Sequence, residues 1–185
     1  MRIVGGELKG RIIQTGRAAS LRPSTEKTRE AIFSVLGADI SGADIADLFC
    51  GSGALGLEAL SRGASRALFV ESSRSTMKVA GRNVHELDLA RRAEFLQCSV
   101  FDLSQDIFVG IDIIFADPPY GKGYCDRLID LLCLKNDAFH GILVLEHEKE
   151  WHCDRPDPAL LRRLDFGDSS VSFFRLRSGV SDAEL

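Results

Sequence analysis

The chain carries two short motifs whose residue types could do chemistry. The first is the glycine-rich run GSGALG at residues 51–56, which has the G-x-G-x-x-G spacing between an apolar stretch and a helical one. Glycines there let the backbone approach a ligand closely, and the N-terminus of the following helix favours electronegative groups. Glu71 ends the next apolar stretch, about 20 residues on, where a carboxylate can accept hydrogen bonds from ribose hydroxyls. The pattern predicts a ribose-containing cofactor bound by Gly51, Gly53, Gly56 and Glu71.

The second motif is the tetrad DPPY at residues 117–120, which follows a fourth apolar stretch. Its prolines fix the backbone, and Pro118 has no N–H, so the local carbonyls and the Asp117 carboxylate remain as hydrogen-bond acceptors. Acceptors beside the flat ring of Tyr120 suit an exocyclic NH2 group on a planar substrate. The lone pair of such a nitrogen is delocalised and must be oriented towards an electrophile. We therefore predict catalytic roles for Asp117, Pro118, Pro119 and Tyr120.

Alternating apolar and helical stretches predict the elements that position these motifs. Strands are expected at residues 45–49, 67–70, 94–98, 111–116 and 142–145, and helices at 54–62, around Met77 to Leu87, and at 124–134. Several strands are apolar on both faces, which is typical of a mostly parallel sheet in an α/β protein. Residues 160–166 and 171–176 are expected to be antiparallel, because the turn between them is too short for a crossover helix. Another helix is expected after Pro23, capped by Ser24 or Thr25.

The composition describes one ordinary domain. The 185 residues are 45% hydrophobic and 27% charged, which excludes a disordered chain. No apolar run approaches the roughly 18 residues that span a bilayer, and the first residues lack a signal-peptide pattern, so we expect a cytoplasmic protein without a membrane partner. The five cysteines include no CxxC pair, and no metal is predicted. Within the domain we expect a basic arm and helix at 1–40, a cofactor-binding core at 41–177 and a tail at 178–185.

The glycine motif alone leaves two kinds of cofactor open, a dinucleotide and S-adenosylmethionine. Asp47 lies in the stretch before the loop, which is similar to motif I of class I S-adenosylmethionine methyltransferases, whose ligand has a cationic methionine and no phosphates. The tetrad is similar to the (D/N/S)PP(Y/F/W) signature of amino-methyltransferases, whereas hydride transfer has no obvious use for it. The two motifs together favour S-adenosylmethionine. The resemblance implies that the methionine end is held by Asp47, Gly51 and Gly53, the ribose by Glu71 and the adenine by Asp102.

Longer segments narrow the choice of acceptor. Residues 2–6, 9–11, 21–25 and 29–30 resemble the N-terminal region of the RsmD family, bacterial 16S rRNA guanine-N2 methyltransferases, and the match continues through 47–64 and 117–120. The resemblance implies a Rossmann-like class I methyltransferase fold: a mostly parallel seven-stranded sheet with an antiparallel C-terminal hairpin and a small N-terminal β arm. It also implies methyl transfer to N2 of one guanine in 16S rRNA, within an assembled or nearly assembled small subunit. Asp117 and Pro118 would hold the amine, and Tyr120 would stack on the base.

Two departures from the family pattern are visible. Ser24 stands where members usually have Thr, which keeps a hydroxyl, and residues 140–168 align poorly. Substrate contacts in the second region are therefore left open.

The net charge of −4 divides unevenly along the chain. The first 30 residues carry seven basic and three acidic side chains, a charge of +4, so the remaining 155 residues carry −8. A basic arm can contact phosphates without reading sequence. We predict RNA contacts by Lys9, Arg11, Arg22 and, just after the tetrad, Lys122. Since the length leaves no room for a recognition domain, we expect a monomer whose specificity depends on the structured ribosomal particle.

Other functions remain open at this point. The same tetrad would serve a DNA adenine-N6 or a protein glutamine-N5 methyltransferase, although such enzymes commonly carry extra recognition domains. A non-catalytic ribosome-assembly factor could use the cofactor fold as a scaffold, but the intact acidic set Asp47, Glu71, Asp102 and Asp117 argues against lost catalysis. A nicotinamide-dependent dehydrogenase is the weakest alternative, because it leaves the tetrad unexplained.

Overall fold

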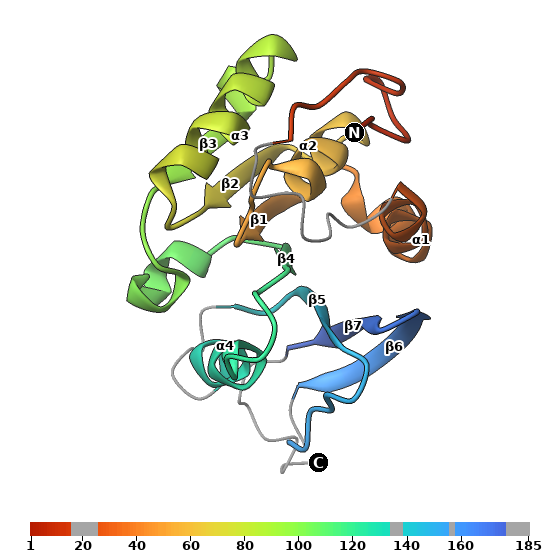
Figure 1. Ribbon diagram of the computed structural model, residues 1–185, viewed down its shortest axis with the longest axis vertical. Helices are drawn as coiled ribbons and strands as arrows, with labels where there is room; N and C mark the ends of the chain where they lie inside the picture. Colours follow the sequence, from red (N-terminus) through yellow and green to blue (C-terminus); the bar gives the residue numbers. More distant parts are fainter. Residues whose placement is uncertain (16–25, 134–138, 156–157, 177–185) are drawn as a thin grey trace, which may run out of the picture.

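The computed structural model describes residues 1–15, 26–133, 139–155 and 158–176, which build one seven-stranded sheet with helices on both faces (Figure 1). The strands lie in the order β3-β2-β1-β4-β5-β7-β6. Their bounds are β1 Asp44–Leu48, β2 Arg66–Val70, β3 Ala93–Leu96, β4 Ile113–Ala116, β5 Ile142–Glu148, β6 Ala159–Phe166 and β7 Ser169–Arg175. β1 to β5 pair in parallel, whereas β7 pairs antiparallel with both β5 and β6. The predicted α/β architecture with an antiparallel C-terminal hairpin is therefore confirmed.

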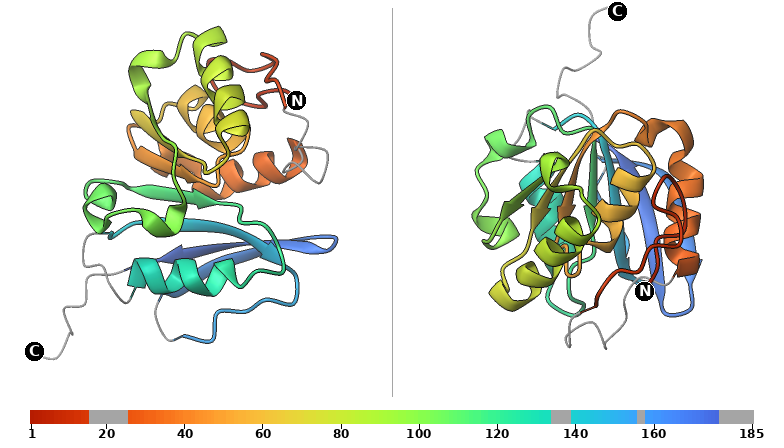
Figure 2. Two further views of the ribbon diagram at one scale, coloured as in Figure 1. Left: turned by 60° about the vertical axis from the view of Figure 1, so that its left-hand side comes forward. Right: turned by 90° about the horizontal axis from the view of Figure 1, so that it is seen from above.

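The central strands are buried because both of their faces are covered. Ile45 and Phe69 belong to the core on one face, with the apolar sides of α1 (Glu26–Leu36), α2 (Ala54–Ser61) and α3 (Arg74–Glu86). Ala46 and Leu48 belong to the core on the other face, with α4 (Tyr124–Cys133) and the short 3-10 turns η4 (Val100–Asp102) and η5 (Gln105–Phe108). Figure 2 shows these two helical layers from two further directions. The remaining turns are η2 (Gly37–Ile40) and η3 (Ala90–Arg92).

The first 15 residues form a loop that is fixed to α2. Their β structure is limited to a single antiparallel bridge between Arg2 and Ile12, so the predicted β arm is much shorter than a hairpin. The fully buried Glu58 of α2 accepts hydrogen bonds from the backbone N–H groups of Val4 (2.9 Å) and Gly5 (2.8 Å). A buried carboxylate is stable only when it is bonded in this way. The arm is therefore part of the packed domain.

Two element boundaries differ from the sequence expectation in ways that affect the site. β5 extends through Glu148, three residues beyond the expected end, because its final residues pair with Val171, Ser170 and Ser169 of β7. β3 ends at Leu96, before the expected end at residue 98. The expected caps Ser24 and Thr25 lie outside the described residues. None of the helices in the described ranges has the length and apolar character needed to cross a bilayer.

Candidate active site

A cavity of about 600 Å³ opens at the carboxyl ends of the parallel strands. Its lining comes from the loop after β1, the residues after β2, the tetrad after β4, the turn η4 and the final part of β5. This end of an open α/β sheet is where such folds bind ligands, because successive loops diverge there. Both sequence motifs therefore contribute to one space.

The loop after β1 turns sharply through left-handed backbone conformations. Phe49, Gly51 and Gly53 have φ angles of 60°, 55° and 80°. The positive φ at Gly53 favours glycine, and a Cβ atom there would also crowd the ring of Phe69 at 3.2 Å. The carbonyl of Ser52 is fixed by the buried Asn83 amide at 2.9 Å. The loop is thereby held at the start of α2, and Gly51 lines the cavity.

Asp47 lies beneath this loop with 3% of its surface exposed. Its Oδ2 accepts the backbone N–H of Gly56 at 2.9 Å. Burial raises the pKa of Asp47 to about 8, and the charge of Glu71 adds to the rise while the Gly56 bond opposes it. Ionisation of Asp47 is therefore costly, and a cation that enters the cavity would offset this cost by stabilising the carboxylate.

Glu71 is oriented towards the glycine loop by two backbone groups. Its Oε2 accepts the N–H of Gly51 at 3.3 Å, and its Oε1 accepts the N–H of Ser73 at 2.8 Å. These bonds leave further lone pairs on the carboxylate, which lines the cavity. Glu71 can therefore accept hydrogen bonds from a ligand hydroxyl without moving.

The tetrad forms the opposite wall. Asp117 continues from β4, and burial together with the charges of Glu146 and Asp47 raises its pKa well above the usual range. Burial raises the pKa of Tyr120, and the side chain of Ser169, the first residue of β7, lies close enough to oppose the rise. The next backbone N–H, of Gly121, donates to the Glu148 carboxylate. Two residues from the β5–β7 pair thus fix the tetrad.

An aromatic group closes the remaining side. The rings of Phe49, Phe101 and Tyr124 lie 5.0–6.0 Å apart between centroids. The guanidinium of Arg127 lies 3.9 Å from the Phe101 ring centre, and the Lys122 ammonium lies 5.8 Å from that of Tyr124. All three rings line the cavity. They offer planar surfaces for stacking at its rim.

Comparison with known proteins places this geometry in a family. A family model described as Conserved hypothetical protein 95 matches residues 1–175, and the relatives include Ribosomal RNA small subunit methyltransferase D of Escherichia coli K12. The chain belongs to this family. It is the RsmD family that the motifs resemble, so that expectation is confirmed. The Escherichia coli relative is 36% identical over 132 residues, which cover 71% of this RsmD-family chain and 66% of that one.

Other relatives cover more of the chain. A Bacillus subtilis protein, provisionally named the rRNA methyltransferase YlbH, is 31% identical over 186 aligned positions that cover 96% of this chain and 100% of that one. A solved Escherichia coli structure, provisionally described as the methyltransferase yhhF, superposes with a TM-score of 0.86 at 31% identity and covers 96% and 98%. An RNA methyltransferase of Salinibacter ruber in complex with S-adenosyl-L-homocysteine shares the fold, with a TM-score of 0.66 at 18% identity over 87% and 97%. The fold is that of class I methyltransferases.

Most of the predicted site residues of this RsmD-family chain meet at the cavity. Those that line it are Asp47, Gly51, Glu71, Asp117, Pro118, Pro119, Tyr120 and Lys122. Gly53 ends the loop as the N-cap of α2 and is not among the lining residues, and Gly56 is a packing glycine whose N–H holds Asp47. Asp102 is exposed and follows the lining residue Phe101, so the structure does not bring it to the cavity.

The predicted RNA contacts are dispersed. Lys9 is exposed on the N-terminal arm, and Arg11 beside it donates to the backbone carbonyl of Glu86 at 2.8 Å. Lys122 is exposed at the cavity rim. Arg22 lies outside the described residues. Of the three that lie in the described residues, Lys122 is therefore the one that the structure brings to the site.

Sequence reasoning missed Glu146 and the aromatic group. Glu146 comes from β5, which carries no motif, and only the pairing of β5 with β4 brings it beside Asp117. Phe49 and Tyr124 lie close in sequence to the two motifs, and this adjacency was the available signal. Phe101 had none.

The donor set of the cavity fits S-adenosylmethionine better than a dinucleotide. Among the described lining residues, four carry carboxyl groups, Asp47, Glu71, Asp117 and Glu146, and one side chain, that of Lys122, is cationic. A pyrophosphate would be repelled by ionised carboxyl groups here, whereas a sulfonium and an ammonium would stabilise the ionised forms of Asp47 and Asp117, whose pKa values are raised. No group of three or more His, Cys, Asp or Glu side chains in the described part of the chain is arranged to hold a metal ion.

Proposed function

We propose that this RsmD-family chain transfers the methyl group of S-adenosylmethionine to the exocyclic N2 amine of a guanine in the 16S rRNA of the small ribosomal subunit. The observation that carries this proposal is that the glycine loop, Glu71 and the DPPY tetrad line one cavity. The relatives named as small-subunit rRNA methyltransferases support rRNA as the substrate. The choice of guanine N2 rests on the resemblance of the motifs to the RsmD pattern.

The cofactor occupies the β1–β2 side of the cavity in this proposal. S-adenosylmethionine supplies an electrophilic methyl group on a sulfonium. Glu71 accepts hydrogen bonds from the ribose hydroxyls, and the carboxylate of Asp47 attracts the cationic methionine end above Gly51. We assign the adenine end to the wall that contains Phe101, because Phe101 lines the cavity and Asp102 does not. Stacking on an aromatic ring suits a purine.

The acceptor base occupies the tetrad side. Asp117 and the Pro118 carbonyl accept hydrogen bonds from the N2 amine, and Tyr120 stacks on the base. The N2 lone pair forms the new N–C bond while the C–S bond breaks and its electron pair stays on sulfur. Asp117 then accepts the proton that the cationic N2 loses and passes it to water. A carboxylate whose pKa is raised is a better proton acceptor than an ordinary one.

The base must leave its stack to reach this wall. Extrusion of a base costs a few kcal/mol, and stacking on an aromatic side chain returns about 1–3 kcal/mol. Tyr120 therefore offsets much of this cost, and phosphate contacts by Lys9, Lys122, Arg11 and Arg22 supply the rest. We propose the assembled or nearly assembled small subunit as the substrate, because it presents the target in a fixed geometry.

Methyl transfer tests the proposal directly. The protein is incubated with labelled S-adenosylmethionine and small subunits from cells that lack the family enzyme, and the rRNA is then digested to nucleosides. Label in N2-methylguanosine is the expected result. Label on adenine would indicate a different base, and label only on protein would indicate a glutamine acceptor. Absence of transfer with retained binding to the subunit would favour an assembly factor.

A further inference from the structure

Glu146 is placed beside the catalytic carboxylate by the pairing of two strands. β4 and β5 are parallel neighbours, with Ala116 opposite Leu145, so the residues that follow, Asp117 and Glu146, lie side by side at the same end of the sheet. Neighbouring strands are about 4.8 Å apart. Both side chains line the cavity together with Tyr120. The tetrad therefore has a second carboxyl group next to the first.

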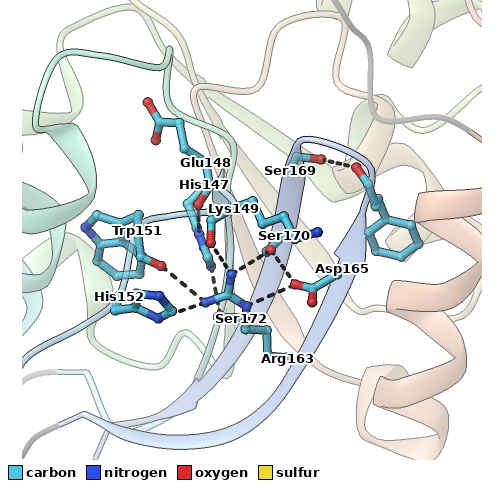
Figure 3. A network of polar contacts seen from close by, with 11 residues as sticks. His147, Glu148, Lys149, Trp151, His152, Arg163, Asp165, Ser169, Ser170 and Ser172 are labelled. Carbon is cyan, nitrogen blue, oxygen red and sulfur yellow. Dashed lines mark hydrogen bonds and ion pairs between the residues drawn. The ribbon is translucent and has the colours of Figure 1, made fainter.

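The end of β5 is held firmly. Glu146 pairs with Val171 of β7, and the buried ring of His147 is hydrogen-bonded to Ser172 Oγ at 2.8 Å. The guanidinium of Arg163 donates to the carbonyls of Lys149 and Trp151 and thereby ties the segment after β5 to the β6–β7 hairpin (Figure 3). A side chain on such a rigid element can hold a ligand group in a fixed position.

The charge of Glu146 acts on two residues of the tetrad. The charge of Glu146 raises the pKa of Asp117, and it also raises the pKa of Tyr120. Carboxyl oxygens can accept more than one hydrogen bond, and a donor that enters between two adjoining carboxyl groups reduces their repulsion. Donors on the substrate are therefore favoured at both positions.

Nucleobases differ in what they present to two adjoining acceptors. On guanine, the ring N1–H lies next to the N2 amine, so two neighbouring donors share one edge. On adenine, the N6 amine lies next to N1, which is an acceptor. A carboxylate opposite that N1 would be repelled and would stay unpaired, and such mismatches discriminate strongly. A glutamine amide offers no second donor group beside its NH2.

We infer that Glu146 accepts a hydrogen bond from the guanine N1–H while Asp117 holds the N2 amine, so that Glu146 selects guanine over adenine. This inference rests on the proposed function and names its specificity-determining residue. Glu146 touches the base at an atom that does not react, whereas Asp117 touches the reacting nitrogen. Substitution of Glu146 should therefore change which base is accepted more than it changes the methyl-transfer step.

A base analogue tests the inference. Small subunits are reconstituted with 16S rRNA that carries either guanine or 2-aminopurine at the mapped target. 2-Aminopurine keeps the reacting amine, lacks O6 and has an unprotonated N1, so the response of the ratio to substitution of Glu146 isolates the contact at N1. The wild-type protein should methylate guanine faster, by at least about tenfold, which is the discrimination of one good base contact. Glu146→Gln can turn its amide N–H towards an unprotonated N1, so the guanine to 2-aminopurine ratio of kcat/KM should fall about tenfold.

Glu148→Gln is the matched control. Glu148 lies on the same strand and binds the backbone N–H of Gly121, so this substitution should lower both rates alike and leave the ratio unchanged. Circular dichroism and S-adenosylmethionine binding report whether each variant is folded. If Glu146→Gln does not fold, the wild-type ratio alone decides, because equal rates on the two bases would overturn the inference.

The outcomes separate the two proposals. If the wild-type protein transfers no methyl group to guanine N2, the proposed function fails. If it methylates guanine N2 but Glu146→Gln keeps the wild-type ratio, only the role of Glu146 is overturned. Loss of discrimination in Glu146→Gln together with an unchanged ratio in Glu148→Gln supports the inference.

Discussion

The two sides of the cavity are built by different means. The cofactor side, around the glycine loop, is held by bonds within residues 47–83: Asp47 with Gly56, Glu71 with Gly51 and Ser73, and Asn83 with Ser52. The acceptor side is held across the sheet. Tyr120 interacts with the side chain of Ser169 of β7, and the N–H of Gly121 donates to Glu148 of β5. A local motif can therefore specify the first side, whereas the second side exists only once β4, β5 and β7 are assembled.

Asp117→Ala should produce the largest effect, and it should affect the acceptor side of the cavity without affecting the cofactor side. Removing the acceptor for the reacting amine should lower kcat by about 10²–10⁴-fold, which is typical for the loss of a positioned proton acceptor or electrostatic group. Cofactor affinity should change little, because Asp117 belongs to the acceptor wall. Single-turnover methyl transfer and calorimetric binding of S-adenosylmethionine measure the two quantities. Weak cofactor binding with normal turnover at saturation would show that Asp117 belongs to the cofactor side instead.

Gly56→Ala should damage the cofactor side through packing. A Cβ there would lie 2.4 Å from the Phe69 ring and 3.2 Å from Asp47 Oδ2. Overpacking of this kind typically costs about 1–3 kcal/mol of unfolding free energy, and displacement of Asp47 should also weaken cofactor binding. Urea denaturation measures the stability.

Gly81→Ala provides the comparison for that experiment. Gly81 lies in α3, and a Cβ there meets nothing within 4 Å. Replacing a helical glycine that has free space should raise stability by about 0.5–1 kcal/mol. Equal losses in the two variants would show that packing against Phe69 is not the reason that position 56 is glycine.

The pH dependence of kcat/KM should distinguish the role of Asp117 from that of Glu146 on the acceptor side. Asp117 must be ionised to accept the proton, and its raised pKa means that kcat/KM should fall on acidification well before an ordinary aspartate would protonate. In Glu146→Gln the neighbouring charge is absent, the pKa of Asp117 is lower, and the acidic limb should move to lower pH. Glu148→Gln should leave the limb in place. A limb that does not move in Glu146→Gln would mean that another group limits the rate.

The same contrast explains what the sequence could predict. Asp47, Gly51, Glu71 and the tetrad were predictable because each lies within or directly after a run of recognisable spacing. Gly56 belonged to the motif, yet its function is to pack on Phe69, which periodicity alone cannot distinguish from ligand contact. Glu146 was not predictable, since its position depends on the register of β5 against β4. The bounds of β5 were also underestimated, because its last three residues are strand only by pairing with β7.

Ser169→Ala should give the smallest effect and tests the long-range support of the acceptor side. The Ser169 hydroxyl donates to the Phe166 carbonyl at 3.3 Å and also interacts with Tyr120. Loss of the interaction with Tyr120, about 1 kcal/mol, should raise KM for the subunit roughly fivefold with kcat nearly unchanged. Tyr120→Phe removes the same interaction and keeps the ring, so the double variant should be no worse than either single one. Ser170→Ala is the control, because its hydroxyl bonds to Asp165 and Arg163 instead. It should lower the melting temperature without changing KM, whereas equal changes in KM would mean that the hairpin, rather than its contact with Tyr120, positions the base.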